Sequence, residues 1–460
     1  MSRMIVSTGF TVLAAAAASA LAQTNFDSFT PIPASVAAGS LPESAPLQFG
    51  SPSFTQTSIA DRTAQLAAGQ FNSGAWDMNT VNETGPDAGR YLFTVFETGQ
   101  SGVQRTDLTT NTTTTVWSSP APAPALNSHV AFDASYWTPF GTYITAEESW
   151  GAQPQPYGRL FELTNATTAT GNVDANFVHR NAVPRVSHEG IQFDNSKNMY
   201  FIDELNGGSI YKYTSQTPNI GASYFSAGET SVLRVGTGTT PNATGAFSWL
   251  PFTDATGAAL AGAVTVVDPN GVSAVDGRAS TDVAAFKGTD YQRPEDLQIK
   301  RMPNGDEVMF AATTTTNEVY SINLTTGNVS VLANRNTLDA ASNVAVGNAF
   351  TSPDNLAIDA EGNIYIIEDQ PGGAADIWLA EDANNDGIAE SVGRWATMST
   401  VGAEPTGLYF DPFDPNVAYV NIQHPASGVD RTLRINAIPE PTTFGLLAAG
   451  VSLLGLRRRR

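Results

Sequence analysis

Short runs of β-branched and aromatic residues recur along the chain, and turn-forming residues bound each run. The segment from Tyr91 to Phe96, for example, reads YLFTVF and is followed by the polar stretch ETGQSG. In six places a run, a polar loop and a second run follow one another, which is the pattern of a β-hairpin. These hairpin-like units begin at Arg90, Gly141, Asn198, Glu307, Asn363 and Val417. Because helical periodicity is scarce between the units, the sequence predicts an all-β protein.

The six units recur at nearly constant spacing. Their first runs align at Tyr91, Tyr143, Tyr200, Val308, Tyr365 and Tyr419, which are 52, 57, 108, 57 and 54 residues apart. A repeat of this length predicts a β-propeller, in which equivalent loops gather at one mouth of a central channel. The double interval leaves two alternatives, a seventh blade between residues 215 and 290 or a loop excursion at 245–277. We predict the loop and six blades.

The propeller domain is predicted to span residues 57–436. Residues 23–56 are rich in Pro, Ser and Ala, and we expect them to form an extended segment or a strand that closes the ring. Residues 1–22 contain Arg3, an Ala-rich apolar run and the sequence ALA before Gln23. This is the pattern of a secretory signal peptide with its cleavage site, so the protein is predicted to be exported.

Residues 437–460 form a separate segment. Pro439, Glu440 and Pro441 precede an apolar stretch from Thr442 to Leu456, and four arginines end the sequence. As a helix this stretch would be about 22 Å long, which is short for a bilayer of about 30 Å. The pattern resembles the PEP-CTERM sorting signal of Gram-negative bacteria. The resemblance implies a short transmembrane sorting helix, recognition by an exosortase, and a cell-envelope or extracellular location, with an ordinary C-terminal anchor as the alternative.

Charge and cysteine content limit the partners and the metal ligands that this chain can have. The formal net charge is −21 at pH 7, and the chain has no cysteine. Nucleic acid is excluded as a partner class, because a phosphate backbone requires a basic protein surface. The acidity favours divalent cations, with solubility as the alternative explanation. Without cysteine the chain has neither a disulfide nor a thiolate that could bind metal.

Acidic residues occur in register with the predicted strands. Three pairs follow a first run, namely Glu147 with Glu148, Asp203 with Glu204, and Glu368 with Asp369. Other acids precede a run: Glu189 after His188, Glu295 and Asp296 after Arg293, Asp354 before Asn355, and Glu404. A single pair of this kind is typical of a surface loop, but a propeller would bring the whole set to one mouth. Ca²⁺ takes roughly six to eight oxygen ligands and would neutralise such a cluster.

Six motifs in order carry a family resemblance. They are TPFGTYITAEE at residues 138–148, VSHEG at 186–190, GAFSWLPF at 245–252, YQRPEDLQI at 291–299, SPDNLAID at 352–359 and VNIQHP at 420–425. Together they resemble the PhoX-like alkaline phosphatases, over about Gly89 to Ile435. The resemblance implies a six-bladed propeller with a calcium–iron cluster that hydrolyses phosphate esters. It also implies metal ligands at Glu147, Glu148, Glu189, Glu295 and Asp354, with Glu404 as a weaker candidate, and catalytic roles for Glu295 and for Arg293 as a phosphate clamp.

The chain departs from this family at two points. The family pattern has an iron-binding cysteine before the two acids, whereas this sequence has Ala146. A methyl group cannot bind metal, so the sequence favours calcium and disfavours iron. The family also usually carries a twin-arginine signal, but MSRM contains one arginine and indicates a Sec-type signal. A Sec substrate crosses the membrane unfolded and acquires its metal outside, which again favours calcium.

A second calcium candidate is the stretch DANNDG. Asp382, Asn384 and Asp386 follow the D-x-N-x-D-G spacing that wraps oxygen ligands around one ion, and Gly387 allows the sharp turn. The twelfth position is Gly393, not the bidentate glutamate of an EF-hand, although Glu390 is near. An ordinary Asn/Asp/Gly turn is the alternative.

Two functions follow from these features. The first is an exported, calcium-dependent hydrolase of a small phosphate ester. The second is a non-catalytic calcium-binding propeller that acts as a surface or matrix scaffold and binds extracellular polysaccharide. The HEG, RPED and SPDN motifs favour the enzyme, and the loss of the cysteine favours the scaffold. A lactonase-type calcium propeller would explain the acids but not the ordered motifs, and the sequence leaves the oligomeric state open.

Overall fold

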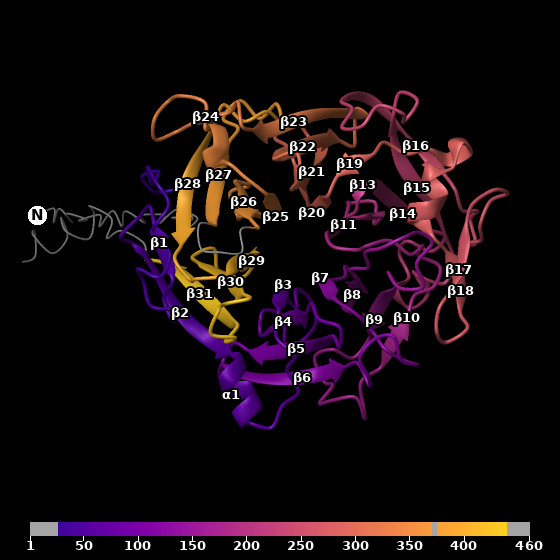
Figure 1. Ribbon diagram of the computed structural model, residues 1–460, viewed down its shortest axis with the longest axis horizontal. Helices are drawn as coiled ribbons and strands as arrows, with labels where there is room; N and C mark the ends of the chain where they lie inside the picture. Colours follow the sequence, from indigo (N-terminus) through magenta and orange to yellow (C-terminus); the bar gives the residue numbers. More distant parts are fainter. Residues whose placement is uncertain (1–25, 370–374, 439–460) are drawn as a thin grey trace, which may run out of the picture.

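The six predicted units form the second and third strands of six antiparallel sheets. The computed structural model of the protein describes residues 26–369 and 375–438, and in it the sheets surround a common centre as blades (Figure 1). The prediction of an all-β, six-bladed propeller is therefore confirmed. The predicted signal peptide at residues 1–22 and the sorting motif Pro439, Glu440 and Pro441 lie outside the described residues.

The blades are named here in chain order. Blade 1 contains β3 (Trp76–Val81), β4 (Tyr91–Phe96), β5 (Gly102–Asp107) and β6 (Thr112–Ser118). Blade 2 contains β7 (Phe132–Trp137), β8 (Tyr143–Glu147), β9 (Leu160–Leu163) and β10 (Phe177–His179). Blade 3 contains β11 (Ile191–Phe193), β12 (Met199–Ile202), β14 (Ile210–Ser215) and β15 (Gly228–Val235).

The second half of the ring follows the same plan. Blade 4 contains β20 (Pro294–Arg301), β21 (Glu307–Thr313), β22 (Glu318–Asn323) and β23 (Asn328–Asn334). Blade 5 contains β25 (Pro353–Ile358), β26 (Ile364–Glu368), β27 (Asp376–Glu381) and β28 (Ser391–Met398), and β24 (Leu338–Asp339) and β1 (Leu47–Phe49) pair with β28. Blade 6 contains β29 (Glu404–Phe410), β30 (Val417–Gln423), β31 (Arg431–Ala437) and β2 (Phe54–Asp61).

The first strand of each blade is its innermost strand. The inner strands β3, β7, β11, β20, β25 and β29 contact one another in this order around the centre, and β29 contacts β3 again. The ring closes in blade 6, where β2 from the N-terminal part pairs antiparallel with β31, from Phe54 opposite Ala437 to Asp61 opposite Arg431. The short helix α1 (Arg62–Ala67) follows β2 directly.

The prediction of a loop at residues 245–277 is wrong in its first part. Residues Gly245–Pro251 form β16, which pairs with β15 along blade 3 and at its start with β23 of blade 4. Phe247 and Trp249 alternate with small residues there, and this period of two is the signal of a strand. No seventh blade exists within residues 26–369 and 375–438.

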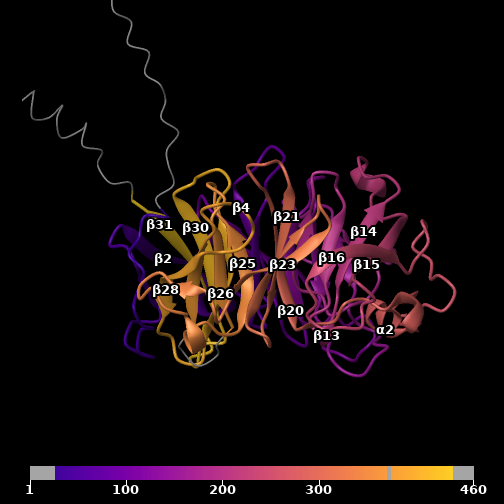
Figure 2. The same ribbon diagram turned by 90° about the horizontal axis from the view of Figure 1, so that it is seen from above.

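Residues 252–290 form an insertion between blades 3 and 4. It contains the hairpin β17 (Thr265–Val267) and β18 (Ser273–Val275), the helix α2 (Gly277–Asp282) and the 3₁₀ turn η2 (Ala284–Phe286). Viewed from the side, α2 lies at the face of the ring where β13 (Asn206–Gly208) also lies (Figure 2). β13 pairs with β19 (Tyr291–Gln292), which leads into β20. The remaining 3₁₀ turns are η1 (Gly221–Ser223) and η3 (Gly347–Ala349).

The core is divided into apolar clusters between neighbouring blades. Six clusters of buried residues each join a different pair of adjacent blades, for example Trp395, Tyr365 and Leu433 between blades 5 and 6. Both faces of a blade therefore meet protein, and strands such as β4 are buried at every position. This explains why the second strands of the blades, such as β4 and β12, appear as continuous apolar runs in the sequence. No helix in the described part of the chain is long and apolar enough to cross a membrane.

Candidate metal centre

One acid at or just before the beginning of each inner strand lines a common cavity. We call these six acids the inner-ring acids: Asp77, Asp133, Glu189, Glu295, Asp354 and Glu404. The cavity has a volume of about 240 Å³. One acid comes from each blade, so the sixfold repeat of the sequence becomes a sixfold convergence of carboxylates.

A repeated backbone feature turns these acids inward. The pairing of each inner strand except β11 with its neighbour shifts register at a β-bulge, for example between Trp76 and Asn79 and between Pro294 and Leu297. Two residues before the acid, five blades have a residue with positive φ, namely Ala75 (48°), Ala131 (35°), Arg293 (54°), Ser352 (44°) and Gly402 (74°). Bulges of this kind re-aim side chains and are frequent beside functional sites.

A second set of acids follows the second strand of four blades. These outer-ring acids are Glu97 after β4, Glu148 after β8, Glu204 after β12 and Asp369 after β26. His424 takes the equivalent place after β30. Together the two rings place ten carboxylates around the cavity, and Arg293 is the only arginine or lysine among the residues that line it.

Burial perturbs these carboxylates strongly. It raises the pKa of Asp77 and of Glu295 to about 7. Burial also raises the pKa of Glu189 well above its ordinary value, and the charges of Asp354 and Glu295 add to the shift. In the absence of cations, several of these acids must stay protonated, because the buried cavity does not tolerate the charge of all ten carboxylates.

The closest group consists of Glu189, Glu295 and Asp354. One oxygen from each of them lies within 4.8 Å of the others. One oxygen of Asp133, of Glu189 and of Glu404 is buried and has no hydrogen-bond partner among the described residues. Buried oxygens without donors are unfavourable unless a proton or a cation joins them. The donors present are almost all carboxylate oxygens, which fit hard cations such as Ca²⁺ and could hold more than one.

Arg293 is fixed by acids on two sides of the cavity. Its Nη2 donates to Glu204 Oε1 at 2.7 Å, and its Nε lies 3.2 Å from Glu295 Oε1. Burial opposes its charge, but Glu295 and Glu204 raise the pKa of the guanidinium. Its Nη1 lies 3.9 Å from Asp369 Oδ2 and has no hydrogen-bond acceptor among the described residues. One edge of the guanidinium is therefore available for an anion.

The structure separates the two acids of the sequence pair 147–148. Glu148 lines the cavity, but Glu147 is fully buried beside it and binds Arg159 through Nη2 at 2.6 Å and Nε at 2.8 Å. Glu147 also accepts hydrogen bonds from the backbone N–H groups of Gly158 and Arg159. The carboxylate predicted as a metal ligand is thus occupied by the protein's own framework, because neighbouring strand residues point to opposite sides.

Ala146 and His188 lie outside the cavity as well. Ala146 is buried in the apolar cluster between blades 2 and 3, so the position offers a methyl group packed against protein. His188 is buried against Phe201, and neither ring nitrogen has a hydrogen-bond partner among the described residues. Burial lowers the pKa of His188 to about 3, and the charge of Arg278 contributes, so this imidazole is neutral.

The second calcium candidate lies far from the acids. Asp382, Asn384 and Asp386 form the turn between β27 and β28, whereas the cavity lies at the end of β26. Both Asp382 oxygens and Asn384 Oδ1 accept backbone N–H groups of Asp386 and Gly387. These bonds are those of an Asn/Asp turn, and a calcium site here stays a prediction.

The sequence predicts only part of the acid set in this cavity. It does not single out Asp77, Glu97 or Asp133, and it places Glu204 and Asp369 among the acids of the mouth without naming them as metal ligands. Asp77 and Asp133 follow an alanine and an aromatic residue, in the sequences AWD and AFD. Aligned with RPE and SPD at Glu295 and Asp354, these triplets would have completed the set.

Solved structures similar to this chain share little sequence with it. A structural genomics protein of unknown function from Bacteroides thetaiotaomicron is 10% identical, with a TM-score of 0.40 over 83% of this chain and 76% of that chain. The PQQ-bound aldose sugar dehydrogenase of Streptomyces coelicolor is 11% identical, with a TM-score of 0.39 over 83% and 98% of the two chains. The C-terminal WD40 domain of Sif2 is 10% identical, with a TM-score of 0.37 over 84% and 99%.

Family comparisons identify two parts of the chain. No curated protein matches it. Residues 437–460 match the PEP-CTERM protein-sorting motif, which marks exported proteins associated with the cell envelope of Gram-negative bacteria. Residues 134–426 match the alkaline phosphatase PhoX family, and this match includes seven of the ten cavity acids and Arg293. The protein therefore belongs to the PhoX alkaline phosphatase family.

Proposed function

We propose that the protein is an exported, calcium-dependent phosphoric ester hydrolase that acts on a small phosphate ester in the acidic cavity. The observation that carries this proposal is the arrangement of ten carboxylates around a single arginine. Acids in this number need cations, and cations in contact with an arginine favour an anionic substrate. The PhoX family membership supports the same reaction class.

Each group of residues has a distinct role in this proposal. Glu189, Glu295 and Asp354 would hold a cation together, and Glu148 and Glu404 would bind further cations at the same cavity. Bound cations would polarise a phosphoryl oxygen and stabilise the charge that develops on it. Arg293 would hold a second phosphate oxygen through Nη1, while Glu204 and Glu295 keep the guanidinium in place.

Calcium fits the donors better than iron does. The lining residues offer carboxylate oxygens and one imidazole, and the chain contains no cysteine. Oxygen-only sites with flexible geometry suit Ca²⁺, whereas thiolates select softer metals. Glu147 is not part of this set, since Arg159 occupies it.

Export and sorting belong to the same proposal. Residues 1–22 would direct secretion, residues 23–56 would lead into the propeller at 57–436, and an exosortase would process the segment 437–460. A Sec-type route requires folding and metal uptake outside the inner membrane, where calcium is available.

Metal content and hydrolysis test the proposal together. We expect the protein purified without chelator to contain calcium by mass spectrometry and to hydrolyse 4-nitrophenyl phosphate or its diester analogue. Activity should disappear in EDTA and return with Ca²⁺. Glu295→Gln should lower activity about 10- to 100-fold, because it removes a charged ligand and a partner of Arg293.

Glu361→Gln is the matched control. Glu361 is an exposed glutamate in a turn of blade 5, and its substitution should change neither calcium content nor activity. Activity that persists in EDTA, or a Glu295→Gln variant with wild-type rates, would contradict the proposal.

A calcium-binding scaffold is the second candidate function. Ala146, in the place of the family's cysteine, is the observation that favours it. Calcium in the purified protein with no hydrolysis of any ester would support this alternative, and binding of extracellular polysaccharide would then be tested next.

A further inference from the structure

Trp150 stands exposed at the rim of the acidic cavity. Five tryptophans are buried, namely Trp76, Trp117, Trp137, Trp378 and Trp395. Trp150 is 44% exposed, although its neighbour Glu148 lines the cavity. The exposed part of the indole contributes little to folding, since this apolar surface stays in contact with water. Its position therefore calls for another explanation.

The indole is joined to the cavity by its polar edge. Its Nε1 donates to Glu204 Oε2 at 2.9 Å and also contacts Glu148. The guanidinium carbon of Arg293 lies 5.1 Å from the ring centre, within cation–π distance. Trp150 thus lies beside the one arginine that lines the cavity, and an anion bound at Arg293 would be next to the ring.

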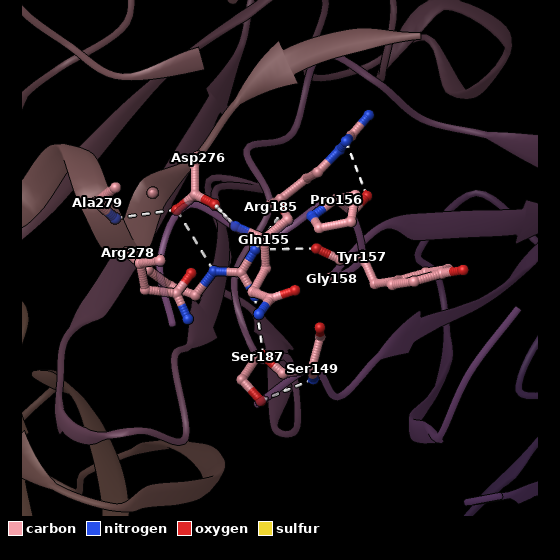
Figure 3. A network of polar contacts seen from close by, with 12 residues as sticks. Ser149, Gln155, Pro156, Tyr157, Gly158, Arg185, Ser187, Asp276, Arg278 and Ala279 are labelled. Atoms are coloured by element: carbon pink, nitrogen blue, oxygen red, sulfur yellow. Dashed lines mark hydrogen bonds and ion pairs between the residues drawn. The ribbon is translucent and has the colours of Figure 1, made fainter. Parts of the chain in front are cut away.

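The loop that carries Trp150 is held rigidly from the insertion between blades 3 and 4. The guanidinium of Arg278 donates to the backbone carbonyls of Ser149, Gln155 and Tyr157 at 2.9–3.1 Å (Figure 3). Asp276 holds the same arginine at 3.0 Å and accepts the backbone N–H of Gln155 at 2.9 Å. Both side chains are buried.

A third contact fixes the start of this loop. The backbone N–H of Ser149 donates to Ser187 Oγ at 2.9 Å, one residue before Trp150 (Figure 3). Arg185 adds a bond to the carbonyl of Pro156 at 2.8 Å. A loop that is fixed at both ends loses less conformational entropy on binding than a free loop would.

We propose that Trp150 is a specificity-determining residue that stacks against the planar aromatic leaving group of a phosphate ester. This inference rests on the proposed function and names its substrate class. In an aryl ester the ring is one oxygen away from phosphorus, so a phosphate on Arg293 Nη1 brings that ring to the indole. Aromatic rings gain affinity from offset or edge contacts, whereas an acyclic alcohol offers no such surface.

Binding of phosphonates measures this preference without turnover. Isothermal titration of the calcium-loaded full chain would use phenylphosphonate, cyclohexylphosphonate and methylphosphonate. We expect the wild type to bind phenylphosphonate about tenfold more tightly than methylphosphonate, and several-fold more tightly than the non-planar cyclohexyl compound, on the order of base–aromatic stacking. Trp150→Leu should bring phenyl- and cyclohexylphosphonate to similar affinities, and Trp150→Phe should keep the phenyl preference.

Trp249→Leu is the matched control. Trp249 also has a cation over its ring, Lys212 at 5.1 Å, but it lies on β16 at the outer edge of blade 3. Its substitution should leave all three affinities unchanged. Methylphosphonate binding without a phenyl preference, or a preference that survives in Trp150→Leu, would overturn the inference alone. No binding of any phosphonate would overturn the proposed phosphate site and the inference with it.

Discussion

At the residue scale, Arg293 combines an uncommon backbone conformation with a demanding side-chain position. Its φ of 54° lies in the left-handed region, where a residue other than glycine costs about 1–3 kcal/mol. The next residue is Pro294, so the strained residue is followed by one whose ring fixes its backbone φ. The ion pairs with Glu204 and Glu295 hold the guanidinium at the cavity despite this strain.

Arg293→Lys tests whether the planar guanidinium is required. A lysine ammonium cannot bind Glu204 and a phosphate oxygen with a fork of fixed geometry. We expect KM for a phosphomonoester and the inhibition constant of inorganic phosphate to rise about tenfold, with a smaller effect on kcat. Steady-state kinetics measure both. Arg301→Lys, at the exposed far end of the same strand, should behave as the wild type. Equal kinetics in the two variants would exclude Arg293 from phosphate binding.

At the element scale, the insertion between blades 3 and 4 stabilises a loop that belongs to blade 2. Arg278, at the start of α2, is the common donor to three carbonyl groups of that loop. The connection is buried, so each of these polar groups depends on the arginine for its hydrogen bond.

Arg278→Met should therefore destabilise the protein strongly. The substitution leaves the buried charge of Asp276 without its cationic partner and three carbonyl groups without their donor, and loss of one partner of a buried ion pair costs about 3–5 kcal/mol. Chemical denaturation measures the free energy of unfolding. Arg90→Met is the comparison, because Arg90 and its partner Asp87 are both exposed and the loss of a surface ion pair should cost much less. Similar losses in both variants would show that the insertion contributes no more than a surface ion pair.

At the scale of the whole molecule, the ring forces acids from six blades into one place. Burial raises the pKa of Asp77 and Glu295 to about 7 and raises the pKa values of Asp133, Glu189, Asp354 and Glu404 well above their ordinary range. Without metal, the folded protein consequently binds more protons than the unfolded chain above about pH 4.

The metal-free protein should lose stability as pH rises. These acids contribute their full stability below the unfolded pKa values near 4, and the contribution disappears as pH rises through about 7. We expect the Tm in EDTA to fall by at least about 5 °C between pH 5 and pH 8. In Ca²⁺ the cations replace the protons and Tm should not fall, since a ligand at 100 times its Kd adds about 2.7 kcal/mol per site. Thermal unfolding by circular dichroism measures both curves.

Asp133→Asn provides the control for this pH dependence. The variant removes one carboxyl group whose pKa is raised, so the slope of Tm against pH in EDTA should be smaller than in the wild type. The same slope with and without Ca²⁺ would mean that the cavity neither stores protons nor binds the cation.

The sequence by itself determined the repeat and much of the site. The alternation of apolar runs and turns is local, so it predicted the strands and the six blades, whereas the two terminal segments predicted export. The ordered motifs also identified Glu148, Glu189, Glu295, Asp354, Glu404 and Arg293, and the structure places all of them around one cavity.

Only the tertiary structure decided which acids face each other. Glu147 and Glu148 are adjacent in the sequence, but one binds Arg159 and the other lines the cavity. Asp77 and Asp133 appear as single acids in apolar surroundings, and their role depends on bulges and on closure of the ring by β2. The physical reason is that strand formation depends on neighbouring residues, whereas side-chain direction and convergence depend on register and on contacts between distant segments.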